Sequence, residues 1–298
     1  MSSVLYDAPG PIARRRELWG SILGGLLILL GMFLAGRYAA GRGVFELDRW
    51  DILWDPPKRQ TAATVWRSLL VQGLGATLKA AAIAAPLALV LGLLLSLWRR
   101  AANRWLRAPA IAVVEVCRGL PVLLVMIFGW LGFGMQPLGA VVFGLVLYNM
   151  AIIAEILRAG LSALPRGQAE AALALGLTRW QTLLSVELPQ AVRTMTPSLI
   201  AQLVVLLKDS SLGFIIGYVE LLRVNQRNTA FFGPQYTVAL FTVGAVVYLA
   251  INISLSRLAL RLQRRGSSRS AGAIDTREAA AELPAGAVIL DPDGGRNV

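Results

Sequence analysis

Glu170-Ala171-Ala172-Leu173-Ala174-Leu175-Gly176 is followed, after nine residues, by Val186-Glu187-Leu188-Pro189. The first of these runs is rich in alanine and leucine, which favour an α-helix. Gly176 can adopt the left-handed conformation that ends a helix. Thr178 can then cap a second helix over 179–187 that stops before Pro189. The stretch predicts a short helical elbow, whose alanines allow another protein surface to approach the backbone closely.

Long apolar segments flank this elbow on both sides. The chain is 56% hydrophobic and 15% charged, whereas soluble domains are roughly half apolar and a quarter charged. Several uncharged runs approach the ~20 residues that a helix needs to cross a bilayer. Open strands cannot cross, because lipid satisfies no backbone hydrogen bonds. We therefore predict an all-α integral membrane protein with about six transmembrane helices.

The apolar runs divide the chain into three parts. Residues 1–67 comprise an N-terminal segment, an extra transmembrane helix at about 18–36 and an external segment that is rich in tryptophan and charge. A signal peptide is the alternative for the first helix, since Ala39-Ala40-Gly41 offers small residues for cleavage, but the apolar run is longer than that of a typical signal peptide, which favours an uncleaved helix. Residues 68–265 form the main membrane domain, with helices at about 72–98, 109–133, 138–157, 197–218 and 236–258 and the elbow within a loop at 165–193. Residues 266–298 show no apolar periodicity and are predicted to be a disordered tail.

The basic residues determine the predicted orientation. The net charge is +12, but the arginines gather in short clusters at the ends of apolar segments, as is typical of membrane proteins. A nucleic-acid interface would need a soluble basic face, so we exclude that partner. The larger share of arginines falls on one side of the membrane, which predicts that the elbow and both termini are cytoplasmic.

The rare residue types limit the chemistry of this chain. It has no histidine and one cysteine, which excludes a disulfide, a Cys/His metal site and a histidine-based catalytic triad. None of its three lysines follows a G-x-x-x-x-G pattern, so no nucleotide-binding P-loop is present. We predict no catalytic residue and no metal site. Any ATP and Mg²⁺ that drive this protein would be bound by a separate chain.

Seven short motifs lie along residues 68–265. They are Gly73-Leu74-x-x-Thr77-Leu78, Glu115-x-x-Arg118-Gly119-x-Pro121, Ala154-Glu155-Ile156-x-Arg158, Pro165-x-Gly167-Gln168-x-Glu170-Ala171-Ala172, Leu175-Gly176-Leu177-Thr178-x-Trp180-Gln181, Leu188-Pro189-Gln190-Ala191-x-Arg193 and Lys208-Asp209-Ser210-Ser211-Leu212. Together with the elbow they resemble the permease subunits of ABC importers that carry an EAA loop, and within them the polar amino acid branch.

This resemblance implies a function and a set of partners. The protein would sit in a bacterial inner membrane and form a pore with a second permease subunit, identical or related. Two cytoplasmic ATPase subunits would bind the elbows, and an external binding protein would deliver the substrate. The residues expected to couple to the ATPase are Gln168, Glu170, Ala171, Ala172, Leu175, Gly176, Leu177, Thr178 and Trp180.

The resemblance favours glutamate, glutamine or aspartate as substrate, although no single residue decides among them. The chain departs from the branch at two places near the expected translocation path. Leu120 replaces a small polar residue, and Met150-Ala151-Ile152 replaces the usual Ala-Tyr. Both departures leave the identity of the substrate open.

Lys208 and Asp209 are charges inside an apolar helix, placed near the membrane midplane by the predicted helix boundaries. Each bare charge there costs on the order of 3 kcal/mol. With Ser210 and Ser211 they could bind the carboxylate and ammonium of an amino acid. The alternative is a structural ion pair with a neighbouring helix, to Glu155 or Arg118.

Three further polar positions are candidates for either role. Arg118 lies three residues after Glu115, and Arg158 lies three residues after Glu155, so each pair can form an ion pair on one helix face, and we favour this structural role. Gly119 and Pro121 are predicted to interrupt the helix beside the first pair, and broken helices often frame substrate sites in transporters. Asn149 could join helices or contact substrate.

A stand-alone secondary transporter, a membrane scaffold without a transport role, and an ABC permease for sugar, phosphonate or metal remain alternative functions. The halves of the chain show no convincing self-similarity, which a secondary transporter of the repeat type would need.

Overall fold

The computed structural model describes residues 10–101, 103–257 and 261. These residues form helices joined by short turns, and none of them lies in a strand. They divide into two compact units. The first takes in residues up to Trp66 together with 228–242, and the second takes in 67–227 together with residues from Val243 onward. The predicted disordered tail, 266–298, lies outside the described residues.

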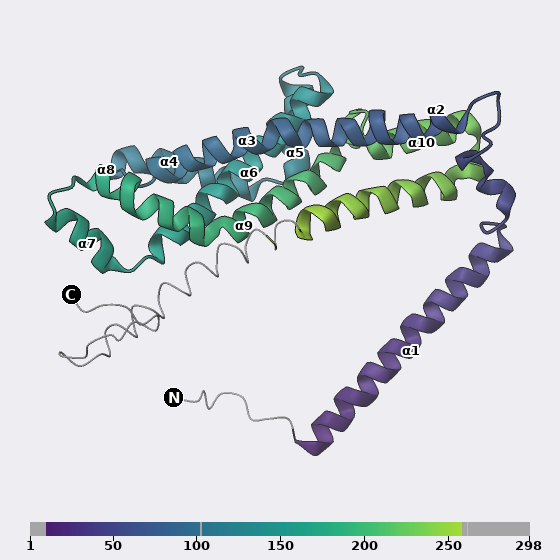
Figure 1. Cartoon of the computed structure of the whole chain (residues 1–298), viewed down its shortest axis with the longest axis horizontal. Coiled ribbons are helices and arrows are strands. Elements are labelled where there is room, and N and C mark those ends of the chain that lie inside the picture. Colours follow the sequence, from purple (N-terminus) through teal and green to yellow (C-terminus); the bar gives the residue numbers. More distant parts are fainter. Residues whose placement is uncertain (1–9, 102, 258–260, 262–298) are drawn as a thin grey trace, which may run out of the picture. The chain divides into compact units, whose positions relative to one another are not determined.

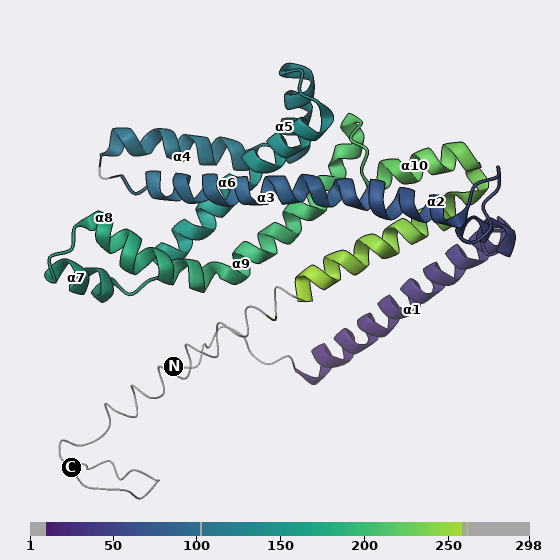
Figure 2. The ribbon, with the colours of Figure 1, turned by 45° about the horizontal axis from the view of Figure 1, so that its top comes forward.

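The second unit contains most of the helices (Figures 1 and 2). Its elements are the π-helical turn η3 (Ser68–Leu74), α3 (Gly75–Trp98), α4 (Arg104–Gly119), α5 (Val122–Ile127), the π-helical turn η4 (Phe128–Gly132), α6 (Pro137–Ser162), α7 (Arg166–Ala174), α8 (Arg179–Thr182), the π-helical turn η5 (Leu183–Glu187), α9 (Leu188–Asp209), the 3₁₀ turn η6 (Ser210–Ile216) and the start of α10 (Leu221–Phe232).

Small residues let α3 pack tightly against α6. A side chain at Gly92 would approach within 2.6 Å of the Ile153 Cγ2 atom and 2.9 Å of the Met150 carbonyl oxygen. Alanines at positions 80, 84 and 88 of α3 are fully buried. Close backbone approach through small residues is the usual way helices associate in lipid, where no hydrophobic drive joins them. We infer that α3 and α6 form a closely joined pair.

Helices α6 and α9 run antiparallel. Gly213, just beyond α9, lies against Val141 near the start of α6. In the middle, Asn149 and Gln202 share a hydrogen bond of 2.8 Å. At the other end, Gly160 meets Met195. Along this pair, therefore, increasing residue numbers in α6 correspond to decreasing numbers in α9.

The predicted interruption of the third membrane segment is confirmed. α4 ends at Gly119 and α5 begins at Val122, with a bend of 101° between the two helical pieces. Leu120 is extended, with φ −87° and ψ 134°, because the residue before a proline is disfavoured in the helical region. The segment begins at Arg104, five residues earlier than predicted, with Asn103 capping it through a 2.9 Å bond from the Trp105 amide.

The predicted stop before Pro189 is wrong. The chain passes from α8 through the π-helical turn η5 directly into α9, with Pro189 in the first turn of α9. A proline ring clashes with the carbonyl four residues before it, and a wider π turn at that point relieves the clash. The fifth membrane segment consequently begins well before Pro197, which lies inside α9.

A buried carboxylate begins α10. Glu220 is 1% exposed, and its side chain accepts hydrogen bonds from the backbone N–H groups of Leu222 and Arg223, at 3.0 and 2.8 Å. These groups are unsatisfied within the helix, so the carboxylate acts as its cap. Burial raises the pKa of Glu220 above its ordinary value, while the two hydrogen bonds act in the opposite direction.

The first unit joins the N-terminal part of the chain to residues 228–242. It includes α1 (Pro11–Gly41), the 3₁₀ turns η1 (Leu47–Arg49) and η2 (Asp51–Leu53), most of α2 (Ala62–Arg67) and the 3₁₀ turn η7 (Pro234–Tyr236). Ile52, Phe232 and Tyr236 are buried. The Lys58 ammonium lies 4.8 Å from the centre of the Phe231 ring and donates to the Phe231 carbonyl.

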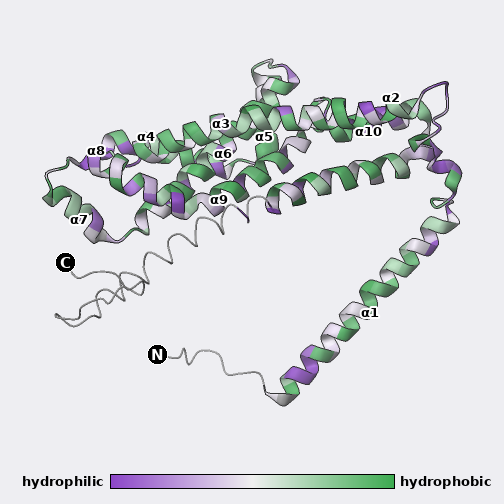
Figure 3. Ribbon diagram, viewed as in Figure 1, coloured by the Kyte–Doolittle hydropathy of each residue, from purple (hydrophilic) through white to green (hydrophobic). Residues whose placement is uncertain are grey.

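Five helices among the described residues are long and apolar enough to cross a membrane, or six if the bent pair α4 and α5 counts as one span. They are Ile12–Gly41, Ala62–Trp98, Pro137–Ser162, Arg179–Ile216 and Pro234–Arg257. Figure 3 shows hydrophobic colour along most of α3 and α6 and hydrophilic colour in the first turns of α1. The prediction of an all-α protein with about six membrane helices is confirmed.

Candidate functional site

The structure confirms two predicted features of the elbow, the end of its first helix at Gly176 and the start of its second helix at Thr178. Gly176 has φ +85°, its N–H donates to the Leu173 carbonyl at 2.9 Å, and the Leu177 N–H donates to the Ala172 carbonyl at 3.2 Å. This pair of bonds is the Schellman motif that closes a helix at a glycine. α7 therefore ends, and the chain reverses, because Gly176 can adopt a left-handed conformation.

A reciprocal cap starts α8. The Gln181 N–H donates to the Thr178 hydroxyl at 3.3 Å, and the Thr178 N–H donates to the Gln181 side-chain oxygen at 2.8 Å. Such a capping box satisfies donors that the first helical turn leaves free. Two caps, one on each side of Leu177, thus fix the angle between α7 and α8.

The elbow presents apolar side chains outward while a small cluster anchors it. Leu183 is buried with Leu161 of α6 and Ala191 of α9. Ala172 is also buried, but Leu175 is 83% exposed and Trp180 is 53% exposed. Exposed apolar groups gathered on one feature are typical of a protein interaction site. Of the other predicted coupling residues, Leu177 is half-buried, whereas Gln168, Glu170, Ala171, Gly176 and Thr178 are exposed.

A hollow of about 430 Å³ lies between the elbow and the end of α3. Its lining comes from Arg100, Ala169, Leu173, Arg179, Trp180, Thr182, Leu183 and Glu187. Figures 1 and 2 both place α7 and α8 at the end of the second unit where α3 ends and α4 begins. Arg100 is the only lining residue outside 169–187, and it forms an ion pair with Glu187 at 3.7 Å.

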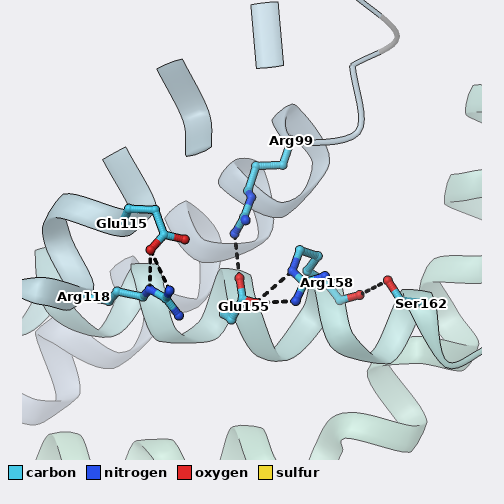
Figure 4. Close-up of polar contacts among 6 residues, drawn as sticks. All are labelled: Arg99, Glu115, Arg118, Glu155, Arg158 and Ser162. Atoms are coloured by element: carbon cyan, nitrogen blue, oxygen red, sulfur yellow. Dashed lines mark hydrogen bonds and ion pairs between the residues drawn. The ribbon is translucent and has the colours of Figure 1, made fainter. Parts of the chain in front are cut away.

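Two charged groups lie among α3, α4 and α6 (Figure 4). The Arg118 guanidinium donates to Glu115, and the Arg158 guanidinium donates to Glu155, with Nε–O distances of 2.9 and 2.8 Å. These are the predicted i,i+3 pairs, and both are confirmed. Arg99 also donates to Glu155, at 2.7 Å. The carboxylate of Glu155 therefore joins the end of α3 to α6.

Lys208 and Asp209 close α9, and no ion pair among the described residues includes either of them. Lys208 is exposed and Asp209 is half-buried. The hydroxyls of Ser210 and Ser211 donate to backbone carbonyls within the same turn, at 2.7 and 2.8 Å. Tyr248 of the last helix also donates to the Lys208 carbonyl, at 3.0 Å. The alternative of an ion pair to Glu155 or Arg118 is not found.

The antiparallel packing of α6 and α9 explains why that ion pair is absent. Asn149 is fully buried, donates to the Leu145 carbonyl at 2.7 Å and accepts from Gln202. Glu155 lies six residues beyond Asn149 and Lys208 six residues beyond Gln202, in opposite directions. At 1.5 Å per residue the two are about 18 Å apart along the helices. Asn149 lies at the middle of α6. α9 ends at Asp209, so Lys208 lies in its last turn and not near the middle of a helix over 197–218, as predicted.

The structure therefore does not gather the predicted substrate residues into one cluster. Arg118 and Glu155 belong to the charged groups near the end of α3, Asn149 to the middle of α6, and Lys208 to Ser211 to the end of α9. Sequence reasoning missed Gln202, although a polar residue in an apolar stretch is a usable signal. The sequence analysis also interpreted the arginines at the ends of apolar segments, which include Arg99 and Arg100, only as a signal of orientation.

A comparison with protein families gives one clear result. Residues 86–267 match the family described as "Binding-protein-dependent transport system inner membrane component". The matched region begins within α3 and includes α6, the whole elbow and α9.

Individual relatives agree with this match. The glutamate transport system permease protein GluD of Corynebacterium glutamicum is 40% identical over 76% of this chain and 82% of its own length. The probable glutamine ABC transporter permease protein GlnP of Bacillus subtilis is 34% identical over 68% of this chain and 94% of its own length. A crystal structure of an amino acid ABC transporter with histidines aligns with a TM-score of 0.62 and 29% identity, covering 68% of this chain and 97% of the other.

Proposed function

This chain belongs to the family of binding-protein-dependent transport system inner membrane components, and from this membership we propose what it carries and how its transport is powered. It is a permease subunit of the amino acid ABC transporter type and not an enzyme. We assign a polar amino acid as the solute. Glutamate, glutamine or aspartate is favoured, since relatives at 34–40% identity are named for transport of these three.

The observation that carries the energy-coupling proposal is the capped elbow with its exposed apolar side chains. Two caps hold α7 and α8 at a fixed angle, while Leu175 and Trp180 remain uncovered. We propose that these side chains enter a groove on a separate cytoplasmic ATPase subunit, which binds ATP and Mg²⁺. By the same proposal the elbow faces the cytoplasm, as both termini do.

The continuity of α8, η5 and α9 suggests how ATP-driven motion reaches the pore. No loop separates the elbow from α9, so a displacement of α8 moves α9 with it. α9 carries Gln202 at the middle of the bundle and Lys208 and Asp209 at its far end. In the proposed cycle, closure of two ATPase subunits on ATP moves two elbows, and the pore between two permease subunits changes from inward-facing to outward-facing. An external binding protein then supplies the amino acid.

We further propose that Lys208, Asp209 and Ser211 line part of the substrate path. The exposure of Lys208 and the absence of an ion pair at either charge, among the described residues, support this proposal. An ammonium and a carboxylate on the protein complement the two charged groups of an amino acid. Asn149 and Ser210 are fully buried, and their side chains donate hydrogen bonds to backbone carbonyls. We therefore assign these two residues to helix packing and not to substrate binding.

The test is transport by the complete complex in proteoliposomes. The permease is purified with its ATPase subunits and supplied with its binding protein, and uptake of labelled glutamate is measured with glutamine and aspartate as competitors. We expect uptake that requires ATP on the ATPase side, with ATP hydrolysis stimulated by the loaded binding protein. Uptake driven by an ion gradient without ATP would show a secondary transporter instead. Failure of all three amino acids to be transported, with ATP hydrolysis intact, would refute the assigned solute.

A further inference from the structure

Two adjacent arginines at the end of α3 contact two different parts of the molecule. Arg99 contacts Glu155 of α6 at 2.7 Å, and Arg100 contacts Glu187 of η5 at 3.7 Å. Arg99 is the C-cap residue of α3, and Arg100 follows it in the turn. The residues that close α3 are thus tied to α6 through Arg99 and to η5 through Arg100.

These charged groups are partly buried. The side chains of Arg99 and Glu155 are 11% and 26% exposed, and those of Arg100 and Glu187 are 32% and 17% exposed. Fully exposed ion pairs contribute little because water and salt screen them. A partly buried pair is screened less, and removing one partner leaves the other poorly solvated. The ion pair between Arg100 and Glu187 is therefore expected to persist while the elbow moves.

The Arg100–Glu187 ion pair links the elbow to the residues that close α3. Among the described residues it is the only ion pair that joins the segment 166–187 to another part of the chain. The elbow is covalently continuous with α6 and α9, but it has no chain connection to α3. Leu97 of α3 packs against the Leu161–Leu183–Ala191 cluster, and Arg100 adds a charged contact from the residues that close α3 to Glu187.

We propose that Arg100 and Glu187 transmit displacement of the elbow to α3, and so act as positioning residues for energy coupling. Motion of η5 draws Arg100 with it. The end of α3 follows, and the tight packing of α3 on α6 together with the Arg99–Glu155 bond carries the motion into the bundle. This inference rests on the proposed function, because it requires an ATPase that moves the elbow.

The test uses the complete ATPase-containing complex in proteoliposomes and measures amino acid uptake per ATP hydrolysed. Arg100→Ala and Glu187→Ala should each lower this ratio by a factor of roughly three to ten, the usual size of coupling effects. The double variant Arg100→Ala/Glu187→Ala should be no worse than either single variant, because both remove the same contact. The exchanged pair Arg100→Glu/Glu187→Arg should recover part of the lost ratio.

Arg107→Ala is the matched control. Arg107 is an exposed arginine in the first turn of α4 and takes part in no ion pair among the described residues, so its removal should leave the ratio unchanged. Co-purification of the ATPase and the thermal midpoint of the complex are measured for every variant. A purely structural role would lower the midpoint without changing uptake per ATP.

The outcomes separate this inference from the proposed function. If the wild-type complex shows no ATP-dependent uptake, the proposed function is wrong. If the wild type couples and Arg100→Ala keeps the same uptake per ATP, the inference is wrong. Loss of the ATPase from the Arg100→Ala complex would also refute it, since the pair would then serve docking. Losses that add in the double variant would show two independent effects, against a shared link.

Discussion

Single residues decide where polar groups can exist inside this helical bundle. Asn149 is tolerated at the middle of α6 because both ends of its amide are bonded, one to Leu145 and the other to Gln202. Lys208 and Asp209 have no such arrangement. A charge left unpaired within a membrane span is expected to face water or a solute. This contrast is why we assign Asn149 to packing and the two charges to the substrate path.

Removing either charge should alter transport and leave the fold intact. Asp209→Asn and Lys208→Met should each raise the KM for amino acid uptake about tenfold, the effect of losing one hydrogen bond to a charged group. The thermal midpoint of the solubilised complex should stay close to that of the wild type, because no buried partner is stranded. Uptake kinetics and thermal unfolding of the same preparations provide the check.

Arg107→Ala supplies the control for loss of an exposed basic residue. Arg107 lies in the first turn of α4 and forms no ion pair among the described residues, so its variant should transport with unchanged KM. A marked drop in thermal midpoint for Asp209→Asn would instead indicate a structural pair. Normal KM in both variants would remove these residues from the substrate path.

At the scale of elements, the elbow shows how far local sequence determines local structure. Gly176 and Thr178 act on their immediate neighbours, and the structure forms the turn and the cap that these residues predict. The same holds for Pro121, which separates α4 from α5. Pro189 was misjudged because the chain widens into a π turn there, and sequence patterns alone do not reveal such a turn. The pairing of Arg100 with Glu187 joins residues 87 positions apart, which no local pattern could show.

Backbone strain at Gly176 should uncouple the transporter. No heavy atom lies within 4 Å of a side-chain carbon built at this position, so a substitution is limited by conformation and not by space. Gly176→Val forces a β-branched residue into the left-handed region, at a cost of about 1–2 kcal/mol. The ratio of amino acid uptake to ATP hydrolysis should fall, while membrane insertion is retained.

Gly176→Asn is the informative comparison, because asparagine tolerates the left-handed conformation better than other side chains. Its uptake per ATP should stay near the wild-type value. Should the valine and asparagine variants behave alike, the conformation at this residue would not matter for coupling, and the elbow would lose its assigned role.

At the scale of the molecule, the two units differ in how they relate to the family. The family match begins at residue 86 and ends at 267, so α1 and the turns that follow it lie outside the match. Yet residues 228–242, inside the matched range, belong to the same unit as the N-terminal segment. Lys58 contacts Phe231 there. Composition predicted the extra helix, but only the folded chain shows what its connecting segment packs against.

The predicted orientation can be measured directly with reporter fusions. A reporter inserted near Pro57 should be active only in a form that works outside the membrane, and one fused after Arg265, beyond the described helices, only in a cytoplasmic form. The reason is the excess of arginine on the side assigned as cytoplasmic. Swapped activities would invert the topology and would place the elbow where no ATPase could reach it. A reporter within the elbow, after Gly176, should match the one after Arg265.

The π-helical turn between α8 and α9 has a consequence for the spacing of residues in this protein. A π turn contains one residue more than an α-helix of the same path requires. Each residue of a helix turns the chain by about 100°. The surplus residue in 183–187 therefore sets the rotation of the elbow about the axis of α9. Deleting one residue there would rotate Leu175 and Trp180 to a different side, with every contact residue still present. In this segment the number of residues, as much as their identity, is under constraint.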